Sequence, residues 1–411
     1  MQQITKKRQT MAQQTQTKQL PKGWKKIPLS EVLDYEQPNG YIVNSEILVE
    51  KTPIPVLTAN KEFIKGYTKE TDGIYRNIPV IIFDDFTADN KFVNFPFKVK
   101  SSAMKILKIK DKNAHLKYIF YQMQLRQVDT GTHKRYYLST YQNLDFLFPI
   151  NKDSTISLQE QQLIVSAIET QFSRLDEAVK VLKSVKDKLR VYRKAVLKKA
   201  FEKEGIKKEK IANICVPNPS KAEVKTLDEN LEVSFIPMAY VSEEGKIVSM
   251  DKRPLKEVSK GFTFFKNGDV LLAKITPCFE NGKKAIAEGL TNGIGFGTTE
   301  FYVFRPNEKA SSKWIFYNIS REDFRALAKR SMGGAVGQQR VSKTMIENFE
   351  VPVPSIEDQK KIVQEIESKF SVINKVEEVV NQSLIKAEKL RKSILKFAFE
   401  GKLVKTEEMQ K

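Results

Sequence analysis

The chain has few of the residues that carry redox, metal and general-base chemistry. Among its 411 residues it contains two cysteines, Cys215 and Cys278, and two histidines, His115 and His133. Two cysteines build no disulfide framework and no Cys-x-x-Cys zinc pair, as is typical of proteins from a reducing compartment. With so little histidine, the usual metal-dependent and histidine-dependent reactions are nearly excluded.

Long apolar runs are missing as well. No segment approaches the roughly 18 consecutive apolar residues of a transmembrane helix. Residues 1–19 are rich in Gln, Thr and Lys, so they lack the apolar core of a secretory signal peptide. The sequence therefore predicts a soluble protein that stays in the cytoplasm.

Recognised catalytic motifs are also absent. The sequence holds no Gly-x-x-x-x-Gly-Lys-Ser/Thr phosphate loop and no Asn-Pro-Pro-aromatic methylation motif, although Pro217–Ser220 has similar letters. Asp84 and Asp85 form an acidic pair that suits either a turn between strands or a Mg²⁺ ion, and the turn is the simpler interpretation. The glycines at 293–297 indicate tight turns rather than a cofactor loop. We expect neither a bound metal nor an active site.

What the chain has in excess is positive charge. Its 70 Lys and Arg against 50 Asp and Glu give a formal net charge of +20. Such a surface attracts polyanions, and nucleic acid is the commonest of these, although membrane-surface proteins share this composition. The length allows two or three domains, and 40% hydrophobic residues suffice to bury real cores.

An internal repeat organises the sequence. Residues 157–202 align without a gap with residues 355–400, and 17 of the 46 aligned positions are identical. Upstream of this segment, Lys117–Tyr121 matches Lys313–Tyr317, and Ser139 and Ser342 each stand ten residues before a proline. The chain is therefore two diverged copies of one unit, each a globular part followed by a long helix.

The two repeated helices carry a heptad pattern. A seven-residue apolar period sustained over several heptads predicts a coiled coil. Ser157 and Ser355 begin the helices in capping-box patterns, and Gly205 and Gly401 stand where helices end. The apolar positions of the two seams are Ile168, Leu175, Leu182, Leu189 and Val196, and Ile366, Ile373, Val380, Ala387 and Ile394.

Each helix is too long for its own globular part. About 46 residues at 1.5 Å per residue give a rod of about 70 Å, which exceeds the width of a domain of ~130 residues. Two rods with matching seams most simply pack on each other. The short connection after the first helix favours antiparallel packing, which would place the globular parts at opposite ends. Each helix packing on its own domain is the alternative.

The globular parts have the pattern of mixed α/β domains with short strands. Strand composition occurs at 80–83 and 95–99 in the first part, and at 269–275 and 300–304 in the second. Helical patterns follow at 116–126 and 313–329. Outside the repeat the two parts share few residues. This divergence on a common frame is what two different recognition domains would show.

At the junctions between globular part and helix, the residues resemble a known family. The resemblance covers roughly residues 20–404 and includes the entry Leu20–Trp24, the junction Phe148–Ile150 with Gln161, and Val351–Val363. Each half is similar to the specificity (S) subunit of type I restriction–modification systems, in which two target-recognition domains alternate with two helical spacers. Residues 1–19 depart from this pattern, and we assign them no role.

The globular parts resemble two classes of recognition domain. The second part matches one class through residues 268–283 and 293–301, and the first resembles another class through residues 83–87 and 97–102. The resemblance implies an α+β protein with two recognition domains joined by two antiparallel coiled-coil helices. The expected segments are a tail (1–19), target-recognition domain 1 (20–155), spacer helix 1 (156–204), a linker (205–225), target-recognition domain 2 (226–353), spacer helix 2 (354–404) and a tail (405–411).

The resemblance implies a function without catalysis. Each recognition domain would read one half of a split double-stranded DNA target, and the helices would set the spacer and dock two methyltransferase subunits. Motor–nuclease subunits would complete the complex. S-adenosylmethionine, ATP and Mg²⁺ would bind to those partners and not to this chain. A self-contained methyltransferase or endonuclease, and a coiled-coil adaptor that binds only proteins, are the alternatives.

The loops before each long helix are the first candidates for DNA contact. They combine flexible backbone with donors suited to phosphates and to base edges. Lysines in the strands and turns are expected to contact phosphates. The candidate DNA-binding residues are Lys98, Lys100, Lys134, Arg135, Tyr136 and Tyr137 in the first part, and Lys274, Lys283, Lys284, Gln338, Gln339 and Arg340 in the second.

Overall fold

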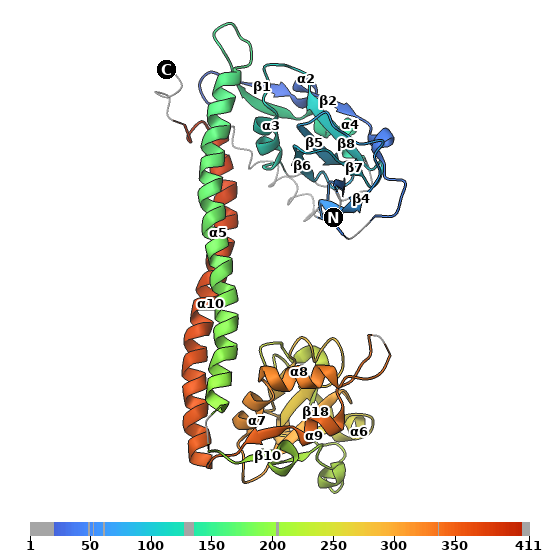
Figure 1. Cartoon of the computed structure of the whole chain (residues 1–411), viewed down its shortest axis with the longest axis vertical. Coiled ribbons are helices and arrows are strands. Elements are labelled where there is room, and N and C mark those ends of the chain that lie inside the picture. The colour runs from blue at the N-terminus through green and yellow to red at the C-terminus, as the bar shows by residue number, and fades with distance from the viewer. Residues whose placement is uncertain are drawn as a thin grey trace, which may run out of the picture. The chain divides into compact units, whose positions relative to one another are not determined.

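A computed structural model describes residues 20–47, 50–51, 53–60, 62–126, 135–202, 205–335 and 337–404. The chain divides into two units, one of residues 1–182 with 382–411 and one of residues 183–381. Each unit contains a mixed α/β domain and one half of each long helix (Figure 1). Both predicted tails, His133 and Lys134 lie outside the described residues.

The first unit contains an antiparallel sheet of strand order β2-β8-β5-β6, a smaller sheet β4-β3-β7 and the pair β1-β9. Its core joins Phe83 and Leu107 from the larger sheet to Tyr118 and Ile119 from α3. Its elements are β1 (Trp24–Pro28), α2 (Leu29–Val32), β2 (Leu33–Glu36), β3 (Ile54–Leu57), β4 (Ile64–Thr68), β5 (Val80–Asp84), β6 (Asn90–Val93), β7 (Lys98–Val99), β8 (Met104–Ile109), α3 (Leu116–Met123), α4 (Tyr136–Ser139) and β9 (Asp145–Pro149).

The second unit contains two four-stranded sheets, β11-β18-β15-β16 and β13-β12-β17-β14, and the pair β10-β19. Its elements are β10 (Lys208–Lys210), β11 (Cys215–Pro217), β12 (Glu232–Ile236), β13 (Asp251–Pro254), α6 (Leu255–Val258), β14 (Thr263–Lys266), β15 (Val270–Ala273), β16 (Lys284–Ile286), β17 (Ile294–Gly297), β18 (Phe301–Pro306), α7 (Ser312–Asn318), α8 (Glu322–Arg330), α9 (Lys343–Asn348) and β19 (Glu350–Pro352).

The two domains repeat one sheet register. The central strand β5 pairs antiparallel with β6 and β8, just as β15 pairs with β16 and β18. Asp84 faces Met104 at the end of the first pairing, and Ala273 faces Phe301 at the end of the second. The internal repeat predicted from the helices therefore extends through the domains, where few residues are shared.

The long helices α5 (Leu158–Phe201) and α10 (Ile356–Phe399) run side by side in opposite directions within each unit (Figure 1). In the first unit Arg391 contacts Asp176, and in the second Arg193 contacts Asn374 and Glu377. The five predicted seam positions of α10 are all buried. In α5, Ile168 and Val196 are buried and the three positions between them are half-buried. The antiparallel coiled coil and the α+β class are thus confirmed.

A buried glutamine joins each domain to its long helix. Gln161 accepts a hydrogen bond from His115 N at 2.9 Å and donates one to Asn113 O at 2.9 Å. In the second unit Gln359 accepts from Ser311 N at 3.1 Å and donates to Lys309 O at 2.7 Å. Both glutamines are fully buried. Each one satisfies backbone groups at the start of α3 or α7, which fixes that helix against α5 or α10.

In each unit, an aromatic contact joins the domain to the last turn of the long helix that belongs to the other copy of the repeat. Phe399 of α10 packs edge-on against Tyr118 in the first domain, and Phe201 of α5 packs against Trp314 in the second. These two pairs are equivalent in the repeat. Each domain is therefore covered by the long helix that follows it and by the last turn of the other long helix.

Two local expectations were wrong. The predicted helix at 313–329 is two helices, α7 and α8, separated at Ile319–Arg321. Gly295 and Gly297, expected in tight turns, lie in the buried strand β17. A Cβ on Gly295 would overlap the Phe265 ring, and one on Gly297 would overlap Ile236 O, so these glycines permit close packing.

Neither α5 nor α10, nor any other helix in the described part of the chain, combines the length and apolar character needed to cross a bilayer.

Candidate nucleic-acid interface

In the first unit, three loops meet where the central strand β5 ends. Asp85 N donates to Ala103 O at 3.2 Å, and Tyr136 N donates to Asp85 O at 2.8 Å. The Asp85 carboxylate accepts from Tyr137 N at 3.0 Å and pairs with the buried Lys105 ammonium at 3.1 Å. These bonds hold the turn after β5, the start of β8 and the start of α4 together.

The second unit has the same junction where β15 ends. Lys274 N donates to Glu300 O at 3.0 Å, and Val341 N donates to Lys274 O at 2.9 Å. Because Asp84 and Ala273 occupy equivalent registers, Asp85 corresponds to Lys274 and Tyr136 to Val341. We call these two places the strand-end junctions. Each is a rigid scaffold that carries exposed loops, which is the usual setting of binding residues.

An arginine directly precedes the last residue of each junction. Arg135 stands before Tyr136, and Arg340 stands before Val341, so the two arginines are equivalent in the fold. Both are exposed. The Arg135 guanidinium has no hydrogen-bond or ion-pair partner among the described residues. The structure thus brings two predicted DNA-binding residues to one position of a repeated frame, although they stand in unrelated local sequences.

Arg340 is held by a carboxylate across the junction. Its Nε lies 3.0 Å from Glu300 Oε2, and its Nη2 lies 2.8 Å from Glu300 Oε1. Its Nη1 donates to Gln338 O at 3.2 Å. The hydrogen bonds that Arg340 donates to Glu300, and then the charge of that carboxylate, raise the pKa of Arg340 above its usual value. Arg340 is therefore a fixed cation with a defined orientation.

The loop at 333–340 is fastened at its base. Arg340 N donates to Gly333 O at 2.8 Å, and Gly333 N donates to Arg340 O at 3.0 Å. Thr276 N donates to Gln339 O at 2.9 Å, and Gln339 N donates to Thr276 Oγ1 at 3.1 Å. Gln339 is half-buried by this pairing, whereas the side chain of Gln338 is exposed. Of the two predicted glutamines, Gln338 is the better placed to reach a ligand.

The predicted lysines differ in how they are placed. Lys100 is exposed and Lys274 is half-buried. Lys283 is half-buried, and its Nζ donates to Met238 O at 3.0 Å. Lys284 lies over the Phe316 ring at 5.2 Å, and burial, followed by the charge of Arg325, lowers its pKa to about 8. Burial disfavours the charged form of the ammonium, so Lys284 is a weaker candidate for a phosphate contact than an exposed lysine.

Three predicted contacts point into the protein and need correction. The side chain of Lys98 is 1% exposed, and its Nζ lies 3.0 Å from Asp72 O and 2.5 Å from Glu70 Oε2. Tyr136 and Tyr137 are buried, and Tyr137 packs against Tyr35 and Phe83. The sequence pattern of a basic, aromatic loop did not reveal that these side chains anchor the junction. We remove all three from the candidate set.

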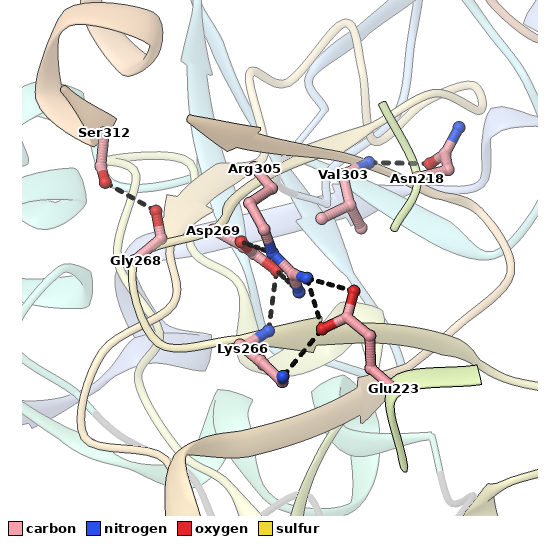
Figure 2. Close-up of polar contacts among 8 residues, drawn as sticks. All are labelled: Asn218, Glu223, Lys266, Gly268, Asp269, Val303, Arg305 and Ser312. Atoms are coloured by element: carbon pink, nitrogen blue, oxygen red, sulfur yellow. Dashed lines mark hydrogen bonds and ion pairs between the residues drawn. The ribbon is translucent and has the colours of Figure 1, made fainter. Parts of the chain in front are cut away.

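Sequence reasoning also missed residues that build the second domain. Arg305 binds both oxygens of Asp269, at 2.9 and 2.8 Å, and both oxygens of Glu223 (Figure 2). Lys266 Nζ lies 2.7 Å from Glu223 (Figure 2). This network ties β14, β15 and β18 together. Nothing in the sequence separates this arginine from exposed ones, because its partners are 36 and 82 residues away.

The remaining motif-like segments have structural explanations. Asp84 Oδ1 accepts from Phe86 N and Thr87 N, both at 2.9 Å, which is the predicted turn. Asp85 faces Lys105 instead of a second carboxylate. Asn218 exchanges hydrogen bonds with the backbone of Val303, so it fastens a linker to β18 (Figure 2).

The second half of the chain matches a known protein family, and relatives match most or part of its length. Residues 203–386 match the family model described as type I restriction modification DNA specificity domain. The EcoR124I/EcoR124II specificity subunit of Escherichia coli is 29% identical over 378 residues, which cover 86% of this chain and 88% of that protein. The EcoAI specificity subunit of E. coli is 37% identical over 170 residues, which cover 41% of this chain and 29% of that protein.

Solved structures share the fold. A structure described as showing complex assembly and conformational transition of the type I R-M system has a TM-score of 0.65 at 14% identity and covers 93% of this chain and 99% of that chain. The HsdS subunit from Thermoanaerobacter tengcongensis has a TM-score of 0.50 at 15% identity, covering 93% of this chain and 98% of that chain.

The repeated domain and the matched family define a DNA-specificity subunit, a recognition protein rather than a catalytic one. By its matched domain and its named relatives, the chain is similar to the specificity subunits of type I restriction–modification systems. This confirms the family and the non-catalytic role that the sequence predicted. It also sets aside a self-contained enzyme and a protein-only adaptor.

Proposed function

We propose that each unit reads one half of a bipartite DNA target through its strand-end junction. The single observation that supports this most strongly is the equivalence of Arg135 and Arg340, two exposed arginines at one position of a repeated frame. The loops around them differ completely in sequence. A shared scaffold with different loops suits two readers of different sequence.

The long helices would set the distance between the half-sites and dock the partners. Each helix is 44 residues long, or about 66 Å at 1.5 Å per residue. The partners would be two methyltransferase subunits and, where cleavage occurs, motor–nuclease subunits. S-adenosylmethionine, ATP and Mg²⁺ would bind to those subunits, and the complex would work in the cytoplasm, where the DNA is.

The experiment replaces each arginine by alanine and maps methylation. Arg135→Ala and Arg340→Ala are expressed with the cognate methyltransferase subunits, and the modified sequences are read by single-molecule methylation mapping. We expect Arg135→Ala to relax only the first half-site and Arg340→Ala only the second, because each side chain belongs to one unit. Arg76, which is exposed, and Arg253, whose side chain is 39% exposed, provide control alanine variants, one in each unit.

The half-site that is relaxed in each variant decides whether the proposal stands. Equal degradation of both half-sites by either variant would contradict the layout of two independent readers. An unchanged recognition sequence in both variants would show that the strand-end junctions do not contact DNA. The control variants are expected to keep the recognition sequence of the unmodified chain.

A further inference from the structure

The guanidinium of Arg340 is only partly used by the protein. Arginine has five N–H donors. In the described part of the chain, three are occupied: Nε and one on Nη2 by Glu300, and one on Nη1 by Gln338 O. Toward the described residues, one donor on each Nη nitrogen is unused, and the side chain is 46% exposed. A half-exposed, oriented pair of donors is a feature of a recognition site.

A structural arginine in the same unit shows the contrast. Arg305 is 21% exposed, and its fork is bound by two carboxylates, one of which belongs to the almost fully buried Asp269 (Figure 2). Arg305 therefore has little left to offer a ligand. Arg340 has one carboxylate partner, Glu300, which is itself 22% exposed. Both arginines pair with carboxylates, but they differ in how many N–H donors remain for a ligand.

The scaffold around the Arg340–Glu300 pair is fixed on both sides. The backbone of Arg340 is bonded to Gly333, and its neighbours are bonded to Lys274 and Thr276. Glu300 N donates to Thr298 Oγ1 at 3.2 Å, and Glu300 O accepts from Lys274 N. The side-chain pair is thus held at its place before any ligand arrives, so little conformational entropy is lost on binding.

We propose that Arg340, oriented by Glu300, reads one guanine in the major groove of the half-site bound by the second unit. This rests on the proposed function. Guanine O6 and N7 are two adjacent acceptors in that groove, and a bidentate arginine is the commonest specific contact to them. Glu300 is a positioning residue, which keeps the guanidinium from turning to the neighbouring phosphates.

The first unit lacks this arrangement. By register, Ala103 occupies the position of Glu300, so the carboxylate that holds Arg340 has no counterpart at that position of the first unit. The acid of that junction, Asp85, is buried and paired with Lys105. Among the described residues, the arginine oriented by a carboxylate at this position therefore belongs to the second unit, and the first half-site is an internal control.

The test measures discrimination between bases. The chain is assembled with its cognate methyltransferase subunits, and binding is measured by fluorescence anisotropy on duplexes in which each base pair of the second half-site is changed in turn. The variants are Arg340→Gln and Glu300→Ala. The controls are Arg253→Ala and Asp251→Ala, from an ion pair whose side chains are 39% and 42% exposed. Assembly and melting temperature of each complex establish that it is folded.

We expect Arg340→Gln and Glu300→Ala to lose the preference for guanine at the same single position, by on the order of tenfold or more. Arg340→Gln should also gain preference for adenine there, because glutamine pairs with adenine N6 and N7. The first half-site and the control variants should keep their preferences.

Three results would overturn this inference while leaving the proposed function standing. They are a uniform loss of affinity over all duplexes, which marks a phosphate contact; a relaxed position that is not guanine; and full discrimination in Glu300→Ala. If neither variant changes any position of the second half-site, the inference and the proposed reading role of this junction fall together.

Discussion

Gln161 and Gln359 show how one residue fixes a helix to a domain. They are identical in the repeat, fully buried, and bonded to backbone groups at the start of α3 and α7. A buried amide is stable only when its donors and acceptors are satisfied, so these side chains hold both elements in one orientation. The sequence alignment marked the position, but the partners became visible only in the structure.

Replacement of Gln161 by alanine is expected to destabilise the first unit. His115 N and Asn113 O would lose their buried partner, at a cost of about 1–3 kcal/mol for each group. Urea unfolding measures this change. The exposed neighbour Gln162 is the matched control, and Gln162→Ala is expected to shift stability by about 0.5 kcal/mol or less. Equal effects of the two changes would contradict the assigned role.

The pair of Lys98 and Glu70 predicts a pH dependence. The hydrogen bond from Lys98, and then those from Ser45, lower the pKa of Glu70 to about 2 from its usual 4.5. A carboxyl whose pKa is lower in the folded state stabilises the fold fully above the unfolded pKa. We therefore expect this contribution to be lost as pH falls from about 4.5 towards 2. Thermal unfolding across this range checks it, and Glu70→Gln should lose less stability with acid than the unmodified chain.

At the scale of elements, the heptad pattern decided which helix faces are buried. Val372 is 61% exposed, whereas its neighbour Ile373 is 2% exposed. The two are similar aliphatic residues, so only the period of the seam separates them. A periodic pattern is a local property that a sequence carries completely, which explains why the helix seams were predicted well.

Aspartate at these two positions should have opposite outcomes. Ile373→Asp buries a charge in the seam and is expected to cost more than about 3 kcal/mol. Val372→Asp leaves the charge in water and is expected to change stability by about 0.5 kcal/mol or less. Urea unfolding followed by circular dichroism compares the two variants. Similar losses would mean that α5 and α10 do not pair through this seam.

The strands and short helices were predicted less well. The apolar runs at 80–83 and 300–304 correspond to β5 and β18. The buried glycine strand β17 was missed, because glycine in a sequence usually indicates a turn and only the Phe265 ring above Gly295 explains its presence. The break between α7 and α8 was also missed, because one amphipathic period passes through it.

At the scale of the whole molecule, each unit is assembled from distant parts of the chain. The first domain is completed by the last turn of α10 and the second by the last turn of α5. The contacts Asp176–Arg391, Lys186–Asn381 and Arg193–Asn374 join residues whose numbers have the same sum. The two helices therefore keep one antiparallel register in both units.

This register allows a sharp test of the proposed spacer. Removing residues 181–187 together with 380–386 deletes one heptad from each helix and leaves the remaining pairs in register. About 10 Å of helix is lost, which corresponds to about three base pairs of DNA. We expect methylation mapping to show a changed spacer or no methylation at all.

The matched variant removes residues 181–187 alone, which shifts one seam relative to the other. That variant is expected to lose stability as well as methylation, because one helix is then a heptad shorter than the other. The seam and the end contacts Phe399–Tyr118 and Phe201–Trp314 can no longer form in one register. An unchanged spacer in the paired deletion would contradict the proposal that the helices set the distance.

The sequence by itself determined the properties that are local or periodic: the net charge, the internal repeat, the helix seams and the capping glycines. Its junction residues also sufficed to indicate the family. Only the tertiary structure decided which basic residues are free. Lys98 and Arg340 read alike in the sequence, yet one is buried against Glu70 and the other lies half-exposed on Glu300. The burial and pairing of these two side chains depend on residues 28 and 40 positions away along the chain. A local sequence pattern does not reveal such distant contacts.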